Sequence, residues 1–387
     1  MNLFKKKARQ AFTLSHAIYM LICIFPAVLV ILFYVYRANI GVMDQVTTRI
    51  SAPVRGALGL LSSVFPFSLM EVLCAVAVIW LIYYIVITII ITTRSREKLR
   101  ILSKRLLTVA VTVLYVWGLF CWLWSSSYHA PGFAEKNGFT GAGVYVEDLT
   151  AVTRLFASKA NELAPLVSRD DDGHFIENRR EFFSSSTQIY NNLAAEFPDL
   201  KVRLYKPKAM MFSWLMSRTG YTGIYFALTG ESNVNTRAPV ALMPATLAHE
   251  LAHQCGVAAE DEANFIGILA SVTSGNIVYE YSGYLMGLMY LRNALFYADF
   301  DAWSDISYSL CVEVNRDLQD NYDYWQSQKK VETGVGFFDD ILTAVTETVS
   351  DAVDTVYDGY LKSQNQELGI RSYGACVDLL VEYYSKY

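Results

Sequence analysis

The segment PATLAHELAHQCGVAAEDEANFIG, residues 244–267, contains two of the five histidines of this 387-residue chain. Its alanines and leucines favour a helix, and Pro244 suits the first turn of that helix. Gly256 suits a left-handed residue just past the helix end. The segment therefore predicts a helix, a glycine turn and then an acidic stretch that starts a second helix.

The polar residues of the first helix have the spacing of a metal site. His249 and His253 are separated by about 400° of helical rotation, so both imidazoles lie on one face and can share one ion. Glu250 lies about 100° away, where it can hold a water molecule better than it can bind the ion. This is the H-E-x-x-H signature of zinc peptidases. The alternative is a pair of histidines on a solvated helix.

Two histidines and a water leave tetrahedral zinc one ligand short. Position 259 is an alanine, so the third histidine of the metzincin spacing is missing. The acidic stretch offers Glu260, Asp261 and Glu262 instead. If the second helix begins near Asp261, Glu262 lies in its first turn and can reach back to the ion. By spacing alone, Glu260 and Asp261 remain alternatives.

Hydrophobic residues make up 53% of the chain and are concentrated near its start. The stretches 17–36, 68–93 and 106–124 are each long enough to cross a bilayer as a helix, which needs about 20 residues. We therefore expect a membrane region of three transmembrane helices at 1–124 and one domain at 125–387.

The charge distribution predicts the orientation. Basic clusters precede the first stretch and join the second to the third, which places both in the cytoplasm. Residues 1–124 carry 13 Lys/Arg against 3 Asp/Glu, net +10, and the rest carries 19 against 34, net −15. We expect a multi-pass membrane protein with a cytoplasmic N-terminus and an acidic extracytoplasmic domain. This domain is not expected to bind nucleic acid or to lie flat on the bilayer.

The exported region has mainly helical periodicity, interrupted by one stretch with a strand-like pattern. Glycine-punctuated β-branched and aromatic residues between 201 and 244 predict a small sheet with a turn at Thr229 and Gly230. We expect a mainly α, α+β domain. Its expected helices, besides the one that carries the histidines, are 146–164, 176–196, 262–274, 280–298, 303–327, 337–361 and a last one within 372–386.

Five blocks carry a family resemblance. HELAHQCGVAAEDEANFIG, PFSLMEVL, TGIYFALTGESNVN, YSGYL and GIRSYGACVDLLVEYY resemble the family named domain of unknown function 3810. The resemblance covers nearly the whole chain. The family is predicted to contain membrane-anchored bacterial zinc peptidases related to the gluzincin clan, which implies a zincin-like exported domain with one Zn²⁺ per chain. The family's substrate is unknown.

The resemblance also implies residue roles. EDEANF is similar to the E-x-E-A-D segment of membrane gluzincins, whose second glutamate is the third zinc ligand, and this role falls on Glu262. Asn264 replaces the aspartate of those enzymes, so the contact that this aspartate usually makes around the zinc ligands is expected to differ. Arg371 and Tyr373, in the block before the last helix, are candidates to stabilise an oxyanion. The alternative is a core tyrosine and an ion-paired arginine.

Residues around the predicted strands and spans have supporting roles. The strand in TGIYFALTGESNVN is expected to pair with an extended substrate. Asn233 and Asn235 either contact that substrate or build the turn, and Glu231 is a candidate to orient a ligand histidine. Glu71, near the outer end of the second span, is expected to make an interfacial or helix-terminal contact.

The predicted function is a membrane-anchored zinc endopeptidase that acts outside the cytoplasm. Zinc held by His249, His253 and Glu262 would activate a water molecule, with Glu250 as the catalytic base. The expected partners are a peptide or protein substrate and the lipid bilayer, and the oligomeric state is not predicted. The alternatives are a peptidase-fold membrane sensor and a non-catalytic cell-envelope scaffold. The basic loop leaves little room for a cytoplasmic effector, and a scaffold has no chemical need of Glu250.

Overall fold

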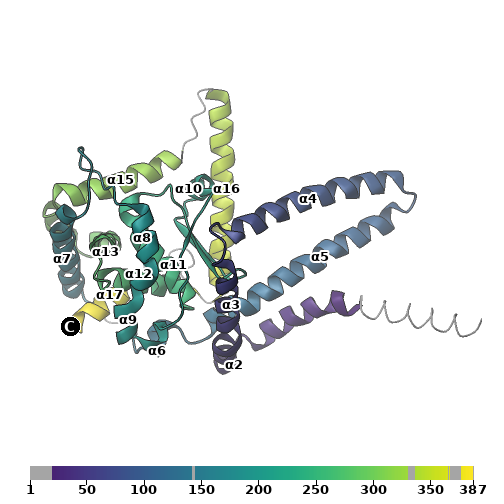
Figure 1. The fold of residues 1–387 in the computed structure, drawn as a ribbon, viewed down its shortest axis with the longest axis horizontal. Coiled ribbons are helices and arrows are strands. Elements are labelled where there is room, and N and C mark those ends of the chain that lie inside the picture. Colours follow the sequence, from purple (N-terminus) through teal and green to yellow (C-terminus); the bar gives the residue numbers. More distant parts are fainter. Residues whose placement is uncertain (1–19, 142–143, 330–335, 365, 367–375, 387) are drawn as a thin grey trace, which may run out of the picture. The chain divides into compact units, whose positions relative to one another are not determined.

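The computed structural model is mostly helical, with one small sheet (Figure 1). It describes residues 20–141, 144–329, 336–364, 366 and 376–386. The chain forms two compact units, which are described separately. Unit 1 comprises Met1–Val54 and Val72–Ala130, and unit 2 comprises Arg55–Glu71 and Pro131–Tyr387. The segment before the second apolar stretch therefore folds with the site-bearing part of the chain.

Two helices are long and apolar enough to cross a membrane, α4 (Leu69–Arg94) and α5 (Lys98–Leu123). Unit 1 contains α5 and the part of α4 that begins at Val72. They lie side by side, joined by a short turn (Figure 1). The apolar window of α4 is wholly exposed, unlike a core helix of a soluble protein. The helix Met20–Tyr36 is apolar but shorter, and the start of the predicted first span lies outside the described residues.

The predicted stretches 68–93 and 106–124 fall on α4 and on the later part of α5. α5 begins at Lys98, so much of the expected basic loop is helical. Unit 1 also contains α2 (Ile40–Val46), a π-helical turn at Thr47–Ser51 and the start of α3 (Ala52–Ser62). Its described residues include a small core formed by Phe33, Met43 and Cys121.

Unit 2 has a helical core in which α11, α12 and α13 pack on one another. α7 covers α13 on the other side (Figure 1). Leucine and isoleucine side chains of α11, α12 and α13 are fully buried there. The helices of unit 2 after α3 are α6 (Phe133–Lys136), α7 (Val146–Leu163), α8 (Arg179–Ser185), α9 (Tyr190–Glu196), α10 (Ser213–Arg218), α11 (Met243–Gln254), α12 (Glu260–Val272), α13 (Ile277–Ala298), α14 (Phe300–Tyr308), α15 (Val312–Gln328), α16 (Gly336–Ser363) and α17 (Cys376–Ser385).

Two of the predicted helices are interrupted. The 176–196 segment forms α8 and α9 with a 3-10 turn between them, and the 303–327 segment forms α14 and α15. At the second break, the Asn161 side chain of α7 donates to the carbonyl of Ser309 and accepts from the amide of Cys311. Such a contact from a distant helix leaves no local signal in the periodicity.

The sheet has the strands β1 (Lys208–Ala209), β2 (Gly223–Phe226) and β3 (Glu231–Val234) in the order β1-β3-β2. β2 is antiparallel to β3, and β1 is parallel to it. The predicted turn at Thr229 and Gly230 is confirmed. Gly230 has φ +67°, and a Cβ there would lie 2.4 Å from the backbone oxygen of Arg55, so this position requires glycine.

Buried carboxylates join the sheet to the first turn of α4. Glu231 forms an ion pair with Lys208 and accepts from the amides of Leu69 and Met70 and from the Thr229 hydroxyl. Lys208 also donates to the Ser62 carbonyl. The expectation that Glu231 orients a ligand histidine is thus replaced by a structural role, because both of its oxygens are used at this helix start.

Glu71 makes the reciprocal contact. It is 4% exposed and accepts from the amides of Met211 and Phe212, at 2.9 and 2.7 Å. This is the helix-terminal contact expected from the sequence. Since Glu231 binds α4 while Glu71 of α4 binds the 211–212 segment, the start of this helix is fixed within unit 2.

Replacing Glu231 by alanine should destabilise unit 2 by about 3–5 kcal/mol, because Lys208 is then left as an unpaired buried cation. Thermal unfolding of the purified full-length chain in detergent measures the effect. The matched control is Glu162→Ala, which removes the exposed pair with Lys159 and should leave the melting temperature unchanged. Equal melting curves for the two variants would contradict the assigned role of Glu231.

Candidate metal centre

The candidate centre lies where α11 crosses α12. Gly267 of α12 faces the backbone of His249, and a Cβ at this glycine would lie 2.8 Å from the His249 nitrogen. The missing side chain lets the two helices approach closely at the first histidine. The predicted turn between them is confirmed: α11 ends at Gln254, and Gly256 has φ +96°.

Three donor atoms converge at this crossing. Oε2 of Glu260 lies 3.3 Å from Nε2 of His249 and 3.6 Å from Nε2 of His253. The three residues are between 4% and 8% exposed, and the three donors lie within 4.8 Å of one another. Two imidazoles from α11 and one carboxylate from the first turn of α12 thus form a single buried cluster.

Neighbouring groups orient each donor. Nδ1 of His253 lies 2.7 Å from the Val257 carbonyl, which can only accept, so this nitrogen carries a proton and Nε2 faces the cluster. Interaction with the Asn264 side chain favours the protonated form of His249 and acts to raise its pKa. Asn264 therefore makes a contact with a histidine even though it replaces the aspartate of the E-x-E-A-D pattern.

Glu260 is oriented from a distant helix. The hydroxyl of Tyr357, on α16, donates to Oε1 of Glu260 at 2.6 Å, which leaves Oε2 facing the histidines. The ring of Tyr221 lies edge-on to that of Tyr357, with centroids 5.9 Å apart. Tyr357 was not identified from the sequence, because it lies 97 residues from Glu260 on a helix with no motif.

The structure brings Glu260, and not Glu262, to the histidines. α12 begins at Glu260, so Glu262 is rotated by about 200° to the opposite side of the helix. There its two oxygens accept from the amides of Phe133 and Ala134, both at 2.9 Å. Glu262 thus holds α6 against α12, and Asp261 does not belong to the cluster.

Glu250 lies beside the cluster with a buried carboxylate. It is 3% exposed, and its Oε2 has no hydrogen-bond partner among the described residues. Gly223 of β2 lies against it, since a Cβ there would be 2.3 Å from Oε1. The pKa of Glu250 is raised to about 8, mainly by burial. His253 opposes this increase, and Glu260 adds to it. The strand therefore approaches this carboxylate through a residue without a side chain.

The charges of the cluster are strongly coupled. Burial disfavours the cation of His253, but Glu260 and Glu250 outweigh this effect and raise its pKa to about 9. Burial lowers the pKa of His249. Burial also opposes ionisation of Glu260, yet the two histidines hold its pKa well below the usual range. The carboxylate of Glu260 is thus stabilised as an anion facing both imidazoles.

The donor set fits a zinc ion. Ligand atoms about 2.1 Å from zinc at the corners of a tetrahedron lie roughly 3.4 Å apart, close to the two observed separations of 3.3 and 3.6 Å. Two imidazoles and a carboxylate also suit this metal chemically. Oε2 of Glu260 has no hydrogen-bond donor among the described residues. An ion at this position would satisfy it.

The other predicted site residues divide into two groups. Arg371 and Tyr373 lie outside the described residues. Asn233 and Asn235 are fully buried. The Asn235 side chain accepts from the amide of Arg237 and donates to the Tyr221 carbonyl, so it builds the end of the strand.

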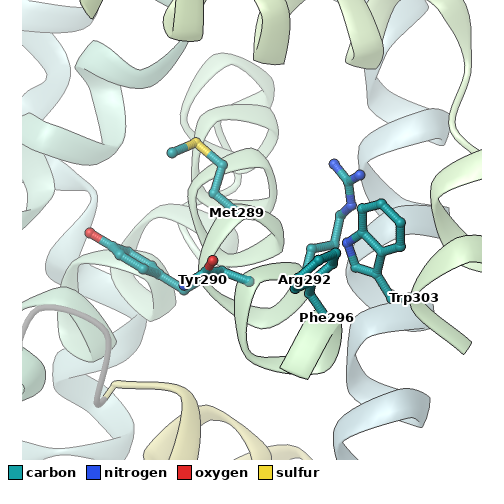
Figure 2. A pocket seen from close by; sticks show the side chains of 6 residues that line it. Met289, Tyr290, Arg292, Phe296 and Trp303 are labelled. Atoms are coloured by element: carbon teal, nitrogen blue, oxygen red, sulfur yellow. The ribbon is translucent and has the colours of Figure 1, made fainter. Parts of the chain in front are cut away.

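A separate pocket opens on α13 and α14. Figure 2 shows the Tyr290 hydroxyl pointing away from Arg292 and Trp303. None of the proposed ligands lines this pocket, so it is not the metal centre. Its lining residues are Met289, Tyr290, Arg292, Asn293, Phe296 and Trp303.

The molecule thus combines long apolar helices with a mainly helical unit that bears an H-E-x-x-H candidate centre. The chain belongs to the family described as "Protein of unknown function (DUF3810)", whose profile matches residues 47–381. The match spans parts of both units and includes all the residues of the cluster. No curated protein and no solved structure matches the chain.

Replacing Gly267 by alanine should destabilise unit 2 by about 1–3 kcal/mol, because the added methyl group forces α12 away from the His249 backbone. Thermal unfolding of the full chain measures this effect. The control is Gly56→Ala on α3, where a Cβ meets nothing within 4 Å. If Gly267→Ala matched or exceeded the control in stability, the close approach would not be required.

Replacing Tyr357 by phenylalanine should weaken zinc binding about 10-fold or more, because Glu260 loses the donor that fixes its rotation. Competition of the purified chain with a chromogenic chelator measures the affinity. Tyr322→Phe serves as the matched control, since Tyr322 is exposed on α15. Equal affinities for the two variants would show that Tyr357 does not position Glu260.

Proposed function

We propose that this chain is a membrane-anchored zinc-dependent peptidase that acts outside the cytoplasm. The observation that carries the proposal is the convergence of His249, His253 and Glu260, with the unsatisfied carboxylate of Glu250 beside them. A hydrolytic site of this kind needs ligands for a metal ion and a base that takes a proton from water. The cluster supplies the ligands, and the buried Glu250 beside it supplies the base.

The ligands proposed for zinc are His249, His253 and Glu260. When bound, zinc would supply Lewis acidity, which polarises a carbonyl and makes a water molecule more acidic. Glu250 takes the proton from the attacking water and then gives it to the departing amine of the peptide. Burial acts to raise the pKa of this carboxyl group, which makes Glu250 a stronger base than an exposed carboxylate.

The edge strand β2 is the proposed substrate-binding element. Among the described strands, β2 pairs only with β3, so we propose that an extended peptide pairs with the other edge of β2. Gly223 brings the strand backbone against Glu250. A peptide added to this edge would bind mainly through its backbone, with little demand on its side chains.

Membrane anchoring is proposed through α4 and α5, which are long and apolar enough to cross a bilayer. The basic residues around the apolar stretches favour a cytoplasmic location for both basic clusters. Unit 2 then lies on the other side of the membrane, with its acidic surface in the extracytoplasmic medium.

Zinc analysis of the purified chain should find about one ion per chain, as expected for a single cluster of three protein ligands. His249→Ala and Glu260→Ala should lose the ion, whereas Glu262→Gln should retain it because Glu262 binds backbone amides instead. The experiment needs the full chain, since Arg55–Glu71 folds within unit 2. Retention of zinc by Glu260→Ala, or its loss from Glu262→Gln only, would refute the proposed ligand set.

Replacing Glu250 by glutamine should reduce peptide hydrolysis by at least about 10²-fold while zinc stays bound, because the amide cannot accept the proton. Comparison of cleaved exported peptides in cells carrying the wild-type chain or Glu250→Gln measures this loss and identifies substrates. The control is Glu162→Gln, at an exposed position on α7. Identical peptide profiles for all three strains would favour a non-catalytic role.

A further inference from the structure

Unit 2 exposes a cluster of large apolar side chains, here named the apolar patch. It comes from the segment before α4 and from the start of α10. The exposed fractions range from 39% for Phe67 to 78% for Val64. The members of the patch are Val64, Phe65, Phe67, Met211, Phe212 and Trp214.

Buried polar contacts hold the two segments of the patch together. Glu71 accepts from the amides of Met211 and Phe212, although these residues are 140 and 141 positions away in the chain. Nearby, Lys208 donates to the Ser62 carbonyl. Since each segment is bonded to the other at its flank, their exposed apolar side chains belong to neighbouring segments of unit 2.

The patch reverses the usual polarity of a water-facing surface. Neither 56–70 nor 209–217 contains a charged residue. Four charged residues flank these segments. Arg55, Glu71 and Lys208 are buried, at 3%, 4% and 8% exposed, and Arg218 is half-buried. The polar groups therefore point inward and the apolar groups outward, which is the pattern of a surface that contacts lipid or another apolar partner.

Continuity with α4 identifies the occupant. Phe67 precedes the first residue of α4 by two positions, and α4 then continues as an apolar helix long enough to span a bilayer. An apolar surface fixed to the first turn of such a helix lies at the depth where the helix enters the membrane. Exposed tryptophan and phenylalanine are also the side chains that bind this boundary.

We propose that the apolar patch inserts into the lipid–water interface of the bilayer that α4 crosses, and so holds unit 2 on the membrane surface. The overall acidity of the region after Trp124, net −15, does not oppose this contact because the patch itself is uncharged. The proposal rests on the proposed membrane anchoring through α4 and on the geometry around Glu71, and it is independent of zinc and of peptide hydrolysis.

The test uses the wild-type full chain in vesicles of phosphatidylethanolamine and phosphatidylglycerol that contain a phospholipid with a photoactivatable diazirine in its acyl chain. After irradiation, peptide mapping by mass spectrometry should find lipid adducts on α4 and on the peptides containing Phe65 and Phe212. These patch peptides should be labelled at least about fivefold more than the α14 peptide containing Tyr308, which is 89% exposed but lies outside the patch. Labelling of the patch at the Tyr308 level, or no labelling of α4, would overturn the proposal.

A second measurement separates lipid from another copy of the chain. Benzoylphenylalanine is placed at Phe212 in the same vesicles, and the mass of the irradiated product is determined. An adduct of one phospholipid supports the proposal, whereas a covalent dimer would assign the patch to a chain–chain interface and overturn it. The same residue at Tyr308 serves as the control for non-specific capture.

Discussion

The close packing of α11 on α12 is the constraint on which the candidate centre depends. The histidines lie on one helix and the carboxylate on the other, so neither helix forms the cluster alone. Gly267 permits the approach at His249, and Gly256 turns the chain sharply enough for α12 to begin within a few residues. Glu260, the first residue of α12, then faces the histidines without a long connecting loop.

The buried glutamates described in unit 2 fall into two kinds. Glu71, Glu231 and Glu262 each receive donors on both oxygens, and in each case backbone amides take part. These residues connect segments far apart in the sequence. Glu250 and Glu260 each keep a buried oxygen without a donor among the described residues. Because an unsatisfied buried carboxylate oxygen is costly to fold, it indicates a ligand or a reacting group.

Local features of the sequence were sufficient to predict the histidine-bearing helix, its glycine turn, the hairpin of β2 and β3, and the apolar segments. Each depends on side-chain periodicity or on a glycine within a few residues. The third ligand was not predictable in this way, since a shift of one residue in the start of a helix rotates every side chain by about 100°. The acidic residues at 260–262 are chemically similar, and only the tertiary contacts of Glu260 and Glu262 distinguish them.

Long-range contacts account for the other features of the structure that the sequence did not predict. Nothing near Tyr357 in the sequence indicates that its hydroxyl meets Glu260, and nothing near Glu231 indicates that Lys208 and the start of α4 surround it. The net charge of the region after Trp124 was similarly incomplete as a guide to its surface. Charge summed over many residues predicts a domain in solvent, but binding to a membrane depends on the few side chains that meet it. In unit 2 Lys208 is buried in a pair with Glu231 and Glu71 is buried on backbone amides, so the segments between these charges present an uncharged surface where the apolar helix begins.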